Sequence, residues 1–451
     1  MTQPETIPPG PAKQQLLKDL KLIRDHPHEY LLQSAKAYGD VVRFSVPGNQ
    51  AYFINHPDHV KHVLQMNHRN YDKNTFQYNA LSRITGQGLL TNVDAEDWLE
   101  KRRIAQPAFS KQSLQGIVPI VTASTRAMLA DWEENIKGGA LIDIDREMMK
   151  VALAVVAQTL FGADLSEQAH RLTGAVMEAL DYLIYQTRTL GMVPGWLPIR
   201  QNRNFKQACQ KIENVVNDLI DRRPPDNPGQ DFLGILIGAR DEAGTPILSR
   251  KEIRDEVITM LIAGHETVAS SLTWSWLLLS GTHEIREKIR LEAQQVLGDR
   301  QPTYEDYQQL TYTRQAYHEA LRLYPPAWLI SRRAIGDDQL GEFSIPGGAL
   351  VIISPYTLHR RPDLWPDPDI FDPARFSETA SNGRHRFGFI PFGGGPRLCI
   401  GNRFAIIEAT LILAMVSRVC SLDLPPGADV KVEALVTMRP HGGLPMKLNP
   451  R

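Results

Sequence analysis

Apolar residues recur at the helical period through most of the chain. Segments such as KVALAVVAQTLFG and QACQKIENVVNDLIDR carry apolar side chains three or four positions apart, which predicts mostly helices from about residue 57 to residue 323. The same pattern returns in NRFAIIEATLILAMVSRVC, after residue 401. Two stretches differ. Residues 41–57 alternate apolar and polar side chains around Pro47-Gly48, predicting a β-hairpin, and residues 334–358 combine β-branched side chains with turn glycines, predicting short strands.

No internal repeat, low-complexity block or linker marks a domain boundary in the sequence. The chain has 451 residues, of which 42% are hydrophobic, and this is enough for a large buried core. We therefore predict one domain over residues 1–451, mainly α with a small β portion. In this domain a β-rich part, about residues 35–60 and 330–360, would pack on a helical part.

One predicted helix, from Ser249 to about Ser280, is unusually long. Ser249 and Glu252 form a capping box at its start, and Gly281 is placed as a stop signal at its end. A helix of this size would be about 48 Å long. Its middle reads LIAGHETVASS, where the interior Gly264 costs about 1 kcal/mol relative to alanine. Either the helix has a solvated face and a packing glycine there, or the segment has a chemical role.

Charge and cysteine content exclude several classes of function. Lys plus Arg number 50 and Asp plus Glu 51, so there is no basic excess to neutralise nucleic-acid phosphates. The three cysteines are Cys209, Cys399 and Cys420, and this odd, sparse number argues against a disulfide framework. The absence of a CxxC pair argues against an iron–sulfur cluster or structural zinc. The proline-rich start MTQPETIPPGPAKQQ lacks a signal-peptide pattern, and no apolar run reaches membrane-spanning length. We expect a soluble cytoplasmic protein without an integral membrane segment.

Cys399 lies in the segment FGGGPRLCIG, residues 392–401. A thiolate is a strong donor to iron, and glycine amides and the start of the helix predicted near Ile400 would stabilise it. Arg397 offers a fork of donors that suits a carboxylate, such as a haem propionate. The full pattern F-x-x-G-x-R-x-C-x-G therefore predicts Cys399 as the axial thiolate of a haem, rather than as a buried structural cysteine.

Together with three further motifs in the same order, this segment resembles the cytochrome P450 family of haem-thiolate monooxygenases, over nearly the entire chain. AGHET, from Ala263 to Thr267, resembles the oxygen-activating segment of the family's long central helix. Glu319 and Arg322 in HEALRLYPP match its E-x-x-R pair, and Arg375 in FDPARF matches the third member of a buried Glu–Arg–Arg network. The resemblance implies the P450 fold, haem b as cofactor and Cys399 as the metal ligand.

The resemblance also implies haem-binding residues outside the cysteine segment. Trp98 and Arg102, in WLEKRRIAQPAF, match a W-x-x-x-R helix that contacts one propionate, although an amphipathic helix with a basic surface gives the same pattern. Arg332 stands where the family contacts the other propionate, but the adjacent Arg333 leaves two registers open. Within the cysteine segment, the implied cofactor-binding residues are Phe392, Arg397, Cys399 and Gly401.

By the same resemblance, one atom of dioxygen is inserted into a substrate C–H bond. Thr267 and Glu266 would deliver protons at the oxygen site, and Gly264 would leave room for oxygen. This acid–alcohol pair favours use of dioxygen over direct use of peroxide. No flavin or iron–sulfur segment remains in the sequence, so electrons would come from an external ferredoxin and its reductase. We expect basic residues to form the docking face: Arg397, Arg403 and those from Lys101 to Arg103.

Substrate is predicted only by class. By family position, the pocket would be lined by Leu89, Leu90, Ala263 and Thr437. This mostly apolar set suits a long hydrocarbon. The stretches TFQYNALSRITGQGLLT and TMRPHGGLP resemble those of bacterial carotenoid hydroxylases, which makes a carotenoid ring carbon the first choice. The alternative is a fatty acid, whose carboxylate Arg83 or Tyr78 would bind.

Two other classes of protein were considered. A non-catalytic haem-thiolate sensor would need Cys399 but has no use for Glu266 and Thr267. An enzyme without haem could use Cys399 as a nucleophile with His441 or His359 as its base, but the glycines and Arg397 have no role in that scheme. Both classes fit the sequence less well than an oxygenase.

Overall fold

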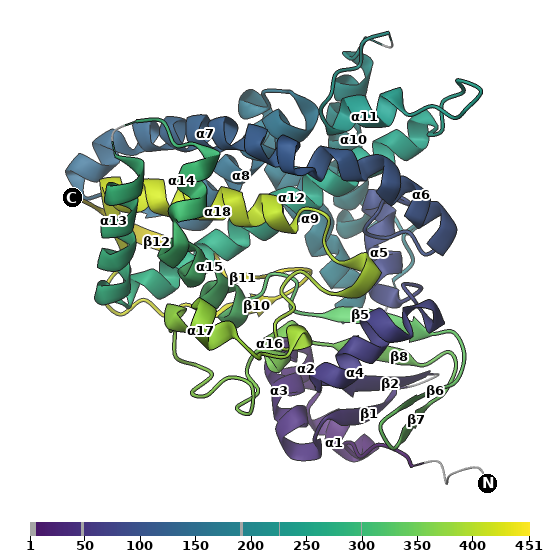
Figure 1. The fold of residues 1–451 in the computed structure, drawn as a ribbon. Coiled ribbons are helices and arrows are strands. Elements are labelled where there is room, and N and C mark those ends of the chain that lie inside the picture. Colours follow the sequence, from purple (N-terminus) through teal and green to yellow (C-terminus); the bar gives the residue numbers. More distant parts are fainter. Residues whose placement is uncertain (1–5, 47–48, 190–192, 225, 299) are drawn as a thin grey trace. The chain divides into compact units, whose positions relative to one another are not determined.

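The structure is a computed structural model that describes residues 6–46, 49–189, 193–224, 226–298 and 300–451 (Figure 1). It is mainly helical with small sheets, which confirms the predicted fold class. The chain divides into two compact units. Unit 1 comprises Met1–Asn79, His318–Cys399 and Val432–Met438, and unit 2 comprises Ala80–Tyr317, Ile400–Lys431 and Arg439–Arg451. The sequence-based view of one domain, with a β part packed on a helical part, stays a prediction.

Unit 1 combines short helices with most of the strands. Its elements are α1 (Lys13–Lys18), α2 (Leu20–Asp25), α3 (Pro27–Tyr38), β1 (Val41–Val46), β2 (Asn49–Ile54), α4 (Pro57–Lys61), η1 (His62–Met66), η2 (His68–Asn70), β3 (Tyr71–Asp72), β5 (Ile330–Ala334), β6 (Asp338–Leu340), β7 (Phe343–Ile345), β8 (Leu350–Ile353), α16 (Pro355–Leu358), η5 (Pro373–Phe376), α17 (Glu378–Ser381), η6 (Arg386–Gly388), η7 (Gly395–Arg397) and β10 (Val432–Ala434). The unit boundary falls inside three elements: α5 (Phe76–Thr85), α15 (Thr311–Leu323) and β11 (Met438–Pro440).

The five-stranded sheet of unit 1 has the order β1-β2-β8-β5-β3. β1 and β2 pair antiparallel, with Val41 opposite Ile54, so the predicted hairpin is confirmed; its turn at Pro47-Gly48 lies outside the described residues. β2 pairs with β8 in parallel, which joins the two β-rich segments of the sequence in one sheet. Buried side chains from these strands, among them Tyr52 and Val351, form the core of this unit.

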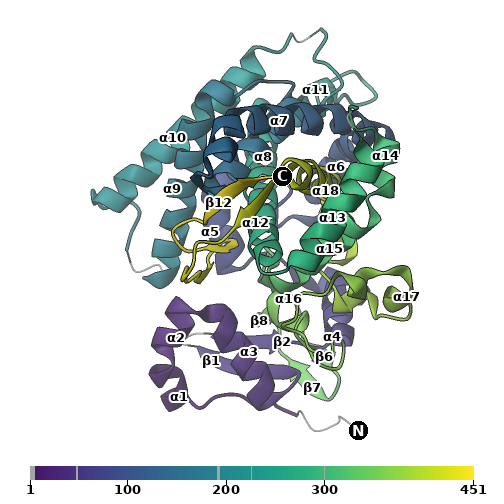
Figure 2. The same cartoon turned by 90° about the vertical axis from the view of Figure 1, so that its left-hand side faces the viewer.

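Unit 2 contains the long helices. Its elements are α6 (Ala95–Ala105), η3 (Gln106–Phe109), α7 (Lys111–Gly138), β4 (Leu141–Asp143), α8 (Ile144–Phe161), η4 (Ser166–Gln168), α9 (Ala169–Arg188), α10 (Arg200–Asp221), α11 (Phe232–Gly238), α12 (Arg250–Ser280), α13 (His283–Leu297), α14 (Tyr304–Gln309), α18 (Asn402–Val419), β9 (Cys420–Asp423) and β12 (Pro445–Pro450). The strands form a sheet of order β4-β12-β9. Helices α9 and α10 lie side by side, as do α7 and α18 (Figure 2).

Helix α12 organises unit 2. It has the predicted capping box, because the Ser249 side chain accepts from the Glu252 amide and the Glu252 side chain accepts from the Ser249 amide. α12 packs against α8, α10 and α18, and most of its side chains are buried on all sides. Close packing on all sides fixes the positions of the residues of this helix within unit 2. None of the helices within the described ranges combines the length and hydropathy that crossing a membrane requires.

Candidate active site

The segment that carries Cys399 forms a closed loop in unit 1. The Cys399 amide donates to the Phe392 carbonyl (3.0 Å), and the Leu398 amide donates to the Gly395 carbonyl (3.1 Å). The first of these bonds brings two of the predicted haem-contacting residues, Phe392 and Cys399, together, and the second closes the turn between them. Helix α18 begins at Asn402, with Gly401 at its N-cap, two residues later than predicted.

The glycines of this loop are required by its shape. Gly393 and Gly395 have φ of 73° and 65°, in the left-handed region that favours glycine. A Cβ on Gly394 would lie 2.6 Å from Cε1 of Phe387, and a Cβ on Gly395 would collide with the Leu64 carbonyl. Packing of the loop therefore explains the glycines, whereas the approach of their amides to sulfur stays a prediction.

The three cysteines differ in their surroundings. Cys420 is buried at the start of β9, and burial raises the pKa of its thiol to about 12. Cys209 on α10 is half-buried, and burial raises its pKa to about 11. Cys399 is exposed. A metal ligand must be reachable and deprotonated, so Cys399 is the cysteine suited to ligation.

Strand β5 resolves which arginine is available to an anion. Arg333 is ion-paired with Asp72. Arg332 points to the other side of the strand, is only 7% exposed and donates to the Ser331 carbonyl (2.8 Å). Within the described part of the chain, no carboxylate pairs with Arg332. A buried guanidinium without a counter-charge is costly, so Arg332 is the residue suited to an anionic group such as a propionate.

In unit 2, α12 has one accessible patch in its middle. From residue 255 to residue 276 every residue is buried except Ala263, Gly264 and Thr267. These three occupy one turn of the helix and share a face. The AGHET segment is therefore the part of the middle of α12 that is not fully buried.

The polar residues of AGHET point in different directions. The Thr267 hydroxyl donates to the Ala263 carbonyl (2.6 Å), so its lone pairs remain available to accept a hydrogen bond. Glu266 is buried, and it has partners within the protein. His265 is also buried, and burial lowers its pKa to about 4, which keeps the ring neutral at pH 7. Of the three polar residues, only Thr267 lies on the accessible patch.

Gly264 lies against α8. A Cβ at this position would be 2.7 Å from Cγ2 of Val156, a buried residue of α8. Close contact between the two helices is thus the physical reason for the glycine, as the packing alternative proposed. Its role in leaving room for oxygen stays a prediction.

We expect Gly264→Ala to destabilise the protein although alanine is the better helix former. The helix propensity gained is about 1 kcal/mol, whereas overpacking a core typically costs about 1–3 kcal/mol. Thermal unfolding of the haem-loaded protein should show the loss. In a Val156→Ala background the same change should be harmless or stabilising, because the clashing methyl is gone. Equal losses in both backgrounds would mean that the contact with α8 is not the cause.

The W-x-x-x-R pair on α6 is also assembled as the spacing predicts. The Arg102 guanidinium lies 5.4 Å from the centroid of the buried Trp98 ring. The neighbouring Lys101 corrects one expectation. Its side chain is 3% exposed and is ion-paired with Asp97 (2.8 Å) and Glu252 (3.3 Å), so it joins α6 to α12. Lys101 therefore cannot belong to a docking face, because its charge is buried and already paired.

The predicted pocket residues Leu89 and Leu90 lie in a loop held against α12. The Leu89 amide donates to Oε2 of Glu256, and the Gln87 amide donates to Oδ2 of Asp255, both at 3.1 Å. Glu256 precedes Ala263 by seven residues, which is two turns or about 10 Å along the helix. Both acids are buried, and burial raises the pKa of Glu256 to about 7. The loop is thus anchored two turns from the accessible patch.

The two acids that anchor the loop were not predicted. The signal was present in the sequence as an adjacent acidic pair inside the apolar stretch IRDEVITMLIAG. Acidic residues buried in a helix need partners, and a glycine-rich loop such as ITGQGLLT can offer its amides. The remaining predicted pocket residue, Thr437, is buried in unit 1.

Glu319, Arg322 and Arg375 meet in unit 1 as a buried network. Nε and Nη2 of Arg322 each lie 2.7 Å from one Glu319 carboxylate oxygen, and Arg375 approaches the same carboxylate at 3.3 Å. Glu319 and Arg322 have no exposed side-chain surface. Burial raises the pKa of Glu319, whereas the two arginines lower it. These three side chains therefore contact one another as predicted. Their contacts join the segment around Glu319 and Arg322 to the segment around Arg375, which lies more than fifty residues later in the sequence.

A sequence model of the family described as Cytochrome P450 matches residues 8–443. The chain belongs to the cytochrome P450 family. It is 35% identical to cyclooctatin synthase of Streptomyces melanosporofaciens over 89% of this chain and 86% of that protein. Identity to pentalenene oxygenase of Streptomyces avermitilis is 34%, over 94% of this chain and 93% of the relative. Identity to Protein LUTEIN DEFICIENT 5 of Arabidopsis thaliana is 30%, over 92% of this chain and 72% of that protein.

This P450 is a monooxygenase that binds haem b through a cysteine thiolate and uses a substrate, dioxygen and redox partners. Its residues fit the cofactor. The accessible thiol of Cys399 suits the iron, and the guanidinium of Arg332 suits a propionate.

In the rival scheme, in which Cys399 acts as a nucleophile, one of the two candidate bases, His359, is unsuited to that role. The ring of His359 is fully buried, with Nε2 accepting from the Ile390 amide (2.9 Å) and Nδ1 lying 3.2 Å from the Arg322 carbonyl. Both ring nitrogens are therefore engaged by the backbone, and burial lowers the pKa of His359 well below its usual value.

Proposed function

We propose that this P450 hydroxylates an isoprenoid hydrocarbon, with Cys399 as the haem ligand. The observation that carries the proposal is the accessible turn of α12: Ala263 offers apolar surface, and Thr267 is its one hydroxyl. Leu89 is anchored nearby on the same helix. A lining of this kind provides contact area for a hydrocarbon and little to bind a polar group.

In the mechanism, the thiolate-ligated haem activates dioxygen for insertion into a C–H bond. The protein positions the substrate and controls protons. Thr267, whose hydroxyl proton is committed to the Ala263 carbonyl, would offer its lone pairs as a hydrogen-bond acceptor at the accessible turn of α12, where a proton has to be held. Glu266, buried one residue earlier, passes protons from within the protein toward this turn. Gly264 keeps the turn close to α8, which fixes the position of the hydroxyl.

Thr267→Ala should separate electron use from product formation. Without the hydroxyl, proton delivery at the oxygen site loses its acceptor, and product formed per electron consumed should fall about tenfold or more. Haem content and the substrate-induced spectral shift should persist, because Thr267 makes no contact that holds the fold beyond its bond to Ala263 within the described residues. Coupled measurement of reductant consumption, peroxide release and product tests this.

Two variants control for effects on the helix. Thr267→Ser retains the hydroxyl and should restore coupling. Thr273→Ala also removes a hydroxyl that lies near the carbonyl four residues earlier, that of Ala269 at 2.9 Å, but from a buried position on α12, where the hydroxyl also lies 3.1 Å from Oδ1 of Asp145. If Thr273→Ala uncoupled the reaction as strongly as Thr267→Ala, or if Thr267→Ala left the yield unchanged, the assigned role would be wrong.

Within the isoprenoids, a carotenoid ring carbon is the first candidate and a smaller cyclic terpenoid the second. The carotenoid is favoured by the sequence resemblance in residues 75–91, and one relative is named for a deficiency of the carotenoid lutein. Another relative is named for oxygenation of the terpenoid pentalenene. Both substrates consist of apolar isoprene units, so the same lining serves them. A fatty acid is less favoured, because Arg83 is exposed on α5 and the ring of Tyr78 is covered by Lys73 at 4.5 Å.

The substrate class is tested by spectral titration and turnover of the haem-loaded protein with β-carotene, pentalenene and a saturated fatty acid. An isoprenoid should shift the haem spectrum and be hydroxylated. Turnover of the fatty acid alone would overturn the proposal.

An acidic ferredoxin with its reductase is the proposed electron donor, with Arg397, Arg403 and the exposed Arg103 as candidate contacts. Equal rates with ferredoxin and with a neutral flavoprotein donor, at low and high salt, would contradict it.

A further inference from the structure

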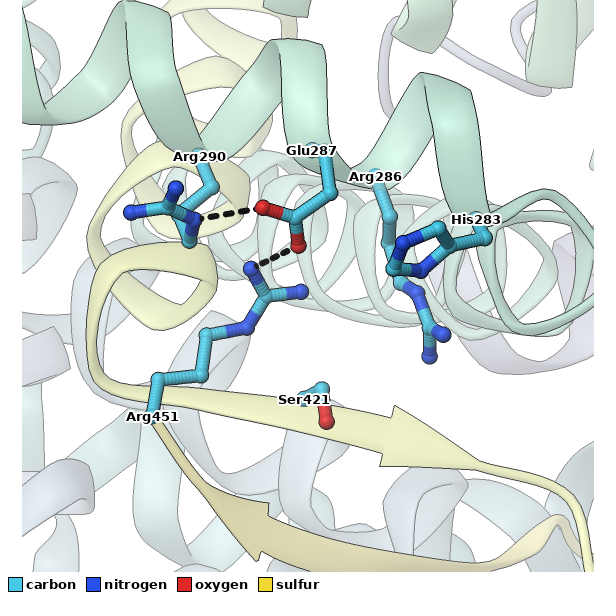
Figure 3. Close-up of a pocket in the computed structure, with 6 residues that line it drawn as sticks. All are labelled: His283, Arg286, Glu287, Arg290, Ser421 and Arg451. Atoms are coloured by element: carbon cyan, nitrogen blue, oxygen red, sulfur yellow. Dashed lines mark hydrogen bonds and ion pairs between the residues drawn. The ribbon is translucent and has the colours of Figure 1, made fainter.

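A cavity rich in arginine lies in unit 2, apart from every residue assigned above. It has a volume of about 370 Å³ and is lined by His283, Arg286, Glu287, Arg290, Ser421 and Arg451 (Figure 3). The first four stand at positions i, i+3, i+4 and i+7 of α13 and therefore share one face of that helix. Ser421 belongs to β9, and Arg451 follows the end of β12. The cavity thus lies between the helix face and the edge of the three-stranded sheet.

The two carboxylates of this region are already paired. Glu287 accepts from Nε of Arg290 (2.8 Å) and from Nη1 of Arg451, one bond to each carboxylate oxygen. Both arginines lower the pKa of Glu287. Arg286 binds Asp423 and the Leu422 carbonyl through a single nitrogen, Nη1. Three guanidinium groups therefore gather around the cavity, and these two carboxylates engage only some of their donors.

Several donors in the cavity remain without a partner. Nε of Arg286 is buried and makes no hydrogen bond. Among the described residues, nothing accepts from Nη2 of Arg286, or from Nε and Nη2 of Arg451. Figure 3 shows the guanidinium groups of Arg451 and Arg286 on opposite sides of the space next to Ser421. A buried donor without an acceptor costs free energy, and an anion between the two arginines would satisfy it.

The start of α13 adds to this positive field. The helix has 15 residues, and its N-cap Thr282 makes no side-chain capping bond. Amides in the first turn of a helix, where His283 stands, favour an anion in addition to the charge of the arginines. The imidazole of His283 lines the same space.

We propose that this cavity binds the phosphate group of a small phosphorylated molecule. Donors reach the space from two separate arginines, and a tetrahedral phosphate can accept from several directions, whereas a carboxylate is satisfied by a single planar fork. The volume lies at the lower end of the range for small-molecule sites, roughly 300–1,000 Å³, and leaves room for an organic part beside the phosphate. Glu287 holds Arg451 in place and is itself neutralised by Arg290.

The test is calorimetric titration of the haem-loaded, full-length protein with inorganic phosphate and with glycerol 3-phosphate, at constant ionic strength set by chloride. Saturable binding of one equivalent is expected. Tighter binding of glycerol 3-phosphate would identify a phosphate monoester as the ligand, and equal binding would identify free phosphate. Absence of saturable binding by both compounds would overturn the proposal.

Variants locate the binding. Arg451→Gln and Arg286→Gln should each weaken phosphate binding about tenfold, because each removes a charge-assisted fork. Arg286→Gln also removes the ion pair with Asp423, so Arg451→Gln is the variant less prone to unfold. Thermal unfolding checks that each variant is folded. Lys288→Gln is the matched control: it removes one positive charge from α13, but from an exposed side chain paired with Glu284. An equal loss of affinity in Lys288→Gln would show a general charge effect and overturn the assignment.

Discussion

Replacing Cys399 by alanine should abolish the red-shifted Soret band of the carbon monoxide complex of the reduced protein. That band reports a thiolate bound to the haem iron, and Cys399 is the exposed cysteine in the loop closed by Phe392. Loss of the ligand should also remove monooxygenase activity completely, because no other donor in the loop can supply electron density to the oxygen. The measurement is the reduced, carbon monoxide difference spectrum together with product formation.

The other two cysteines provide matched controls. Cys209→Ala and Cys420→Ala remove thiols whose pKa is raised to about 11 and about 12, so neither supplies a thiolate at pH 7. Both variants should keep the band at full amplitude per haem. Cys399→Ser should retain the shape of the loop but lose the thiolate spectrum. Persistence of the band in Cys399→Ala, or its loss in Cys209→Ala, would place the ligand elsewhere.

Local features were predictable from the sequence because each depends on neighbours in the chain. The capping box of Ser249 and Glu252 sets the start of α12, and the alternation of residues 41–57 sets the hairpin of β1 and β2. The spacing of Trp98 and Arg102 likewise places them on one helix face. In each case the partners lie within a few residues or adjacent strands, so periodicity was sufficient.

Contacts between distant segments were not predictable in the same way. Lys101 was expected on a docking face, yet Glu252, about 150 residues later, pairs with it in the interior. The reason for Gly264 is Val156, which belongs to another helix, and the reason for Gly395 is the Leu64 carbonyl. A single sequence shows that a glycine or a charge is present, but the neighbour that requires it is set by packing.

Strand β5 is an intermediate case. The sequence favoured Arg332 but left its register open because of the adjacent Arg333, and alternation along a strand requires that the two point to opposite faces. Pairing with β3 places Asp72 opposite Arg333 and thereby decides between them. The sequence left the register open, and the cross-strand partner shows that Arg333 is the arginine paired with a carboxylate.

Glu319→Ala should yield little haem-loaded protein. The change leaves Arg322 buried without its two carboxylate bonds, and its remaining acceptors are three carbonyls, those of His359, Pro368 and Ile370. Removing one member of a buried charged pair costs about 3–5 kcal/mol, which is a large part of the roughly 5–15 kcal/mol that keeps a typical domain folded. Because the same carboxylate also accepts from the Asp372 amide (3.0 Å), the segment from Asp372 toward the Cys399 loop loses an anchor.

An exposed acid–base pair distinguishes this effect from a simple loss of charge. Glu133 on α7 lies 2.8 Å from Lys137, and both side chains are exposed. This pair also joins a carboxylate to a cationic side chain, but exposed pairs contribute little to stability. Glu133→Ala should therefore give the same yield, haem occupancy and thermal unfolding as the parent protein. Glu319→Gln should remain impaired, because an amide turns one of its two acceptors into a donor that faces Arg322. Normal haem occupancy in Glu319→Ala would show that the network is dispensable, and the assignment of a structural role to Arg322 and Arg375 would be withdrawn.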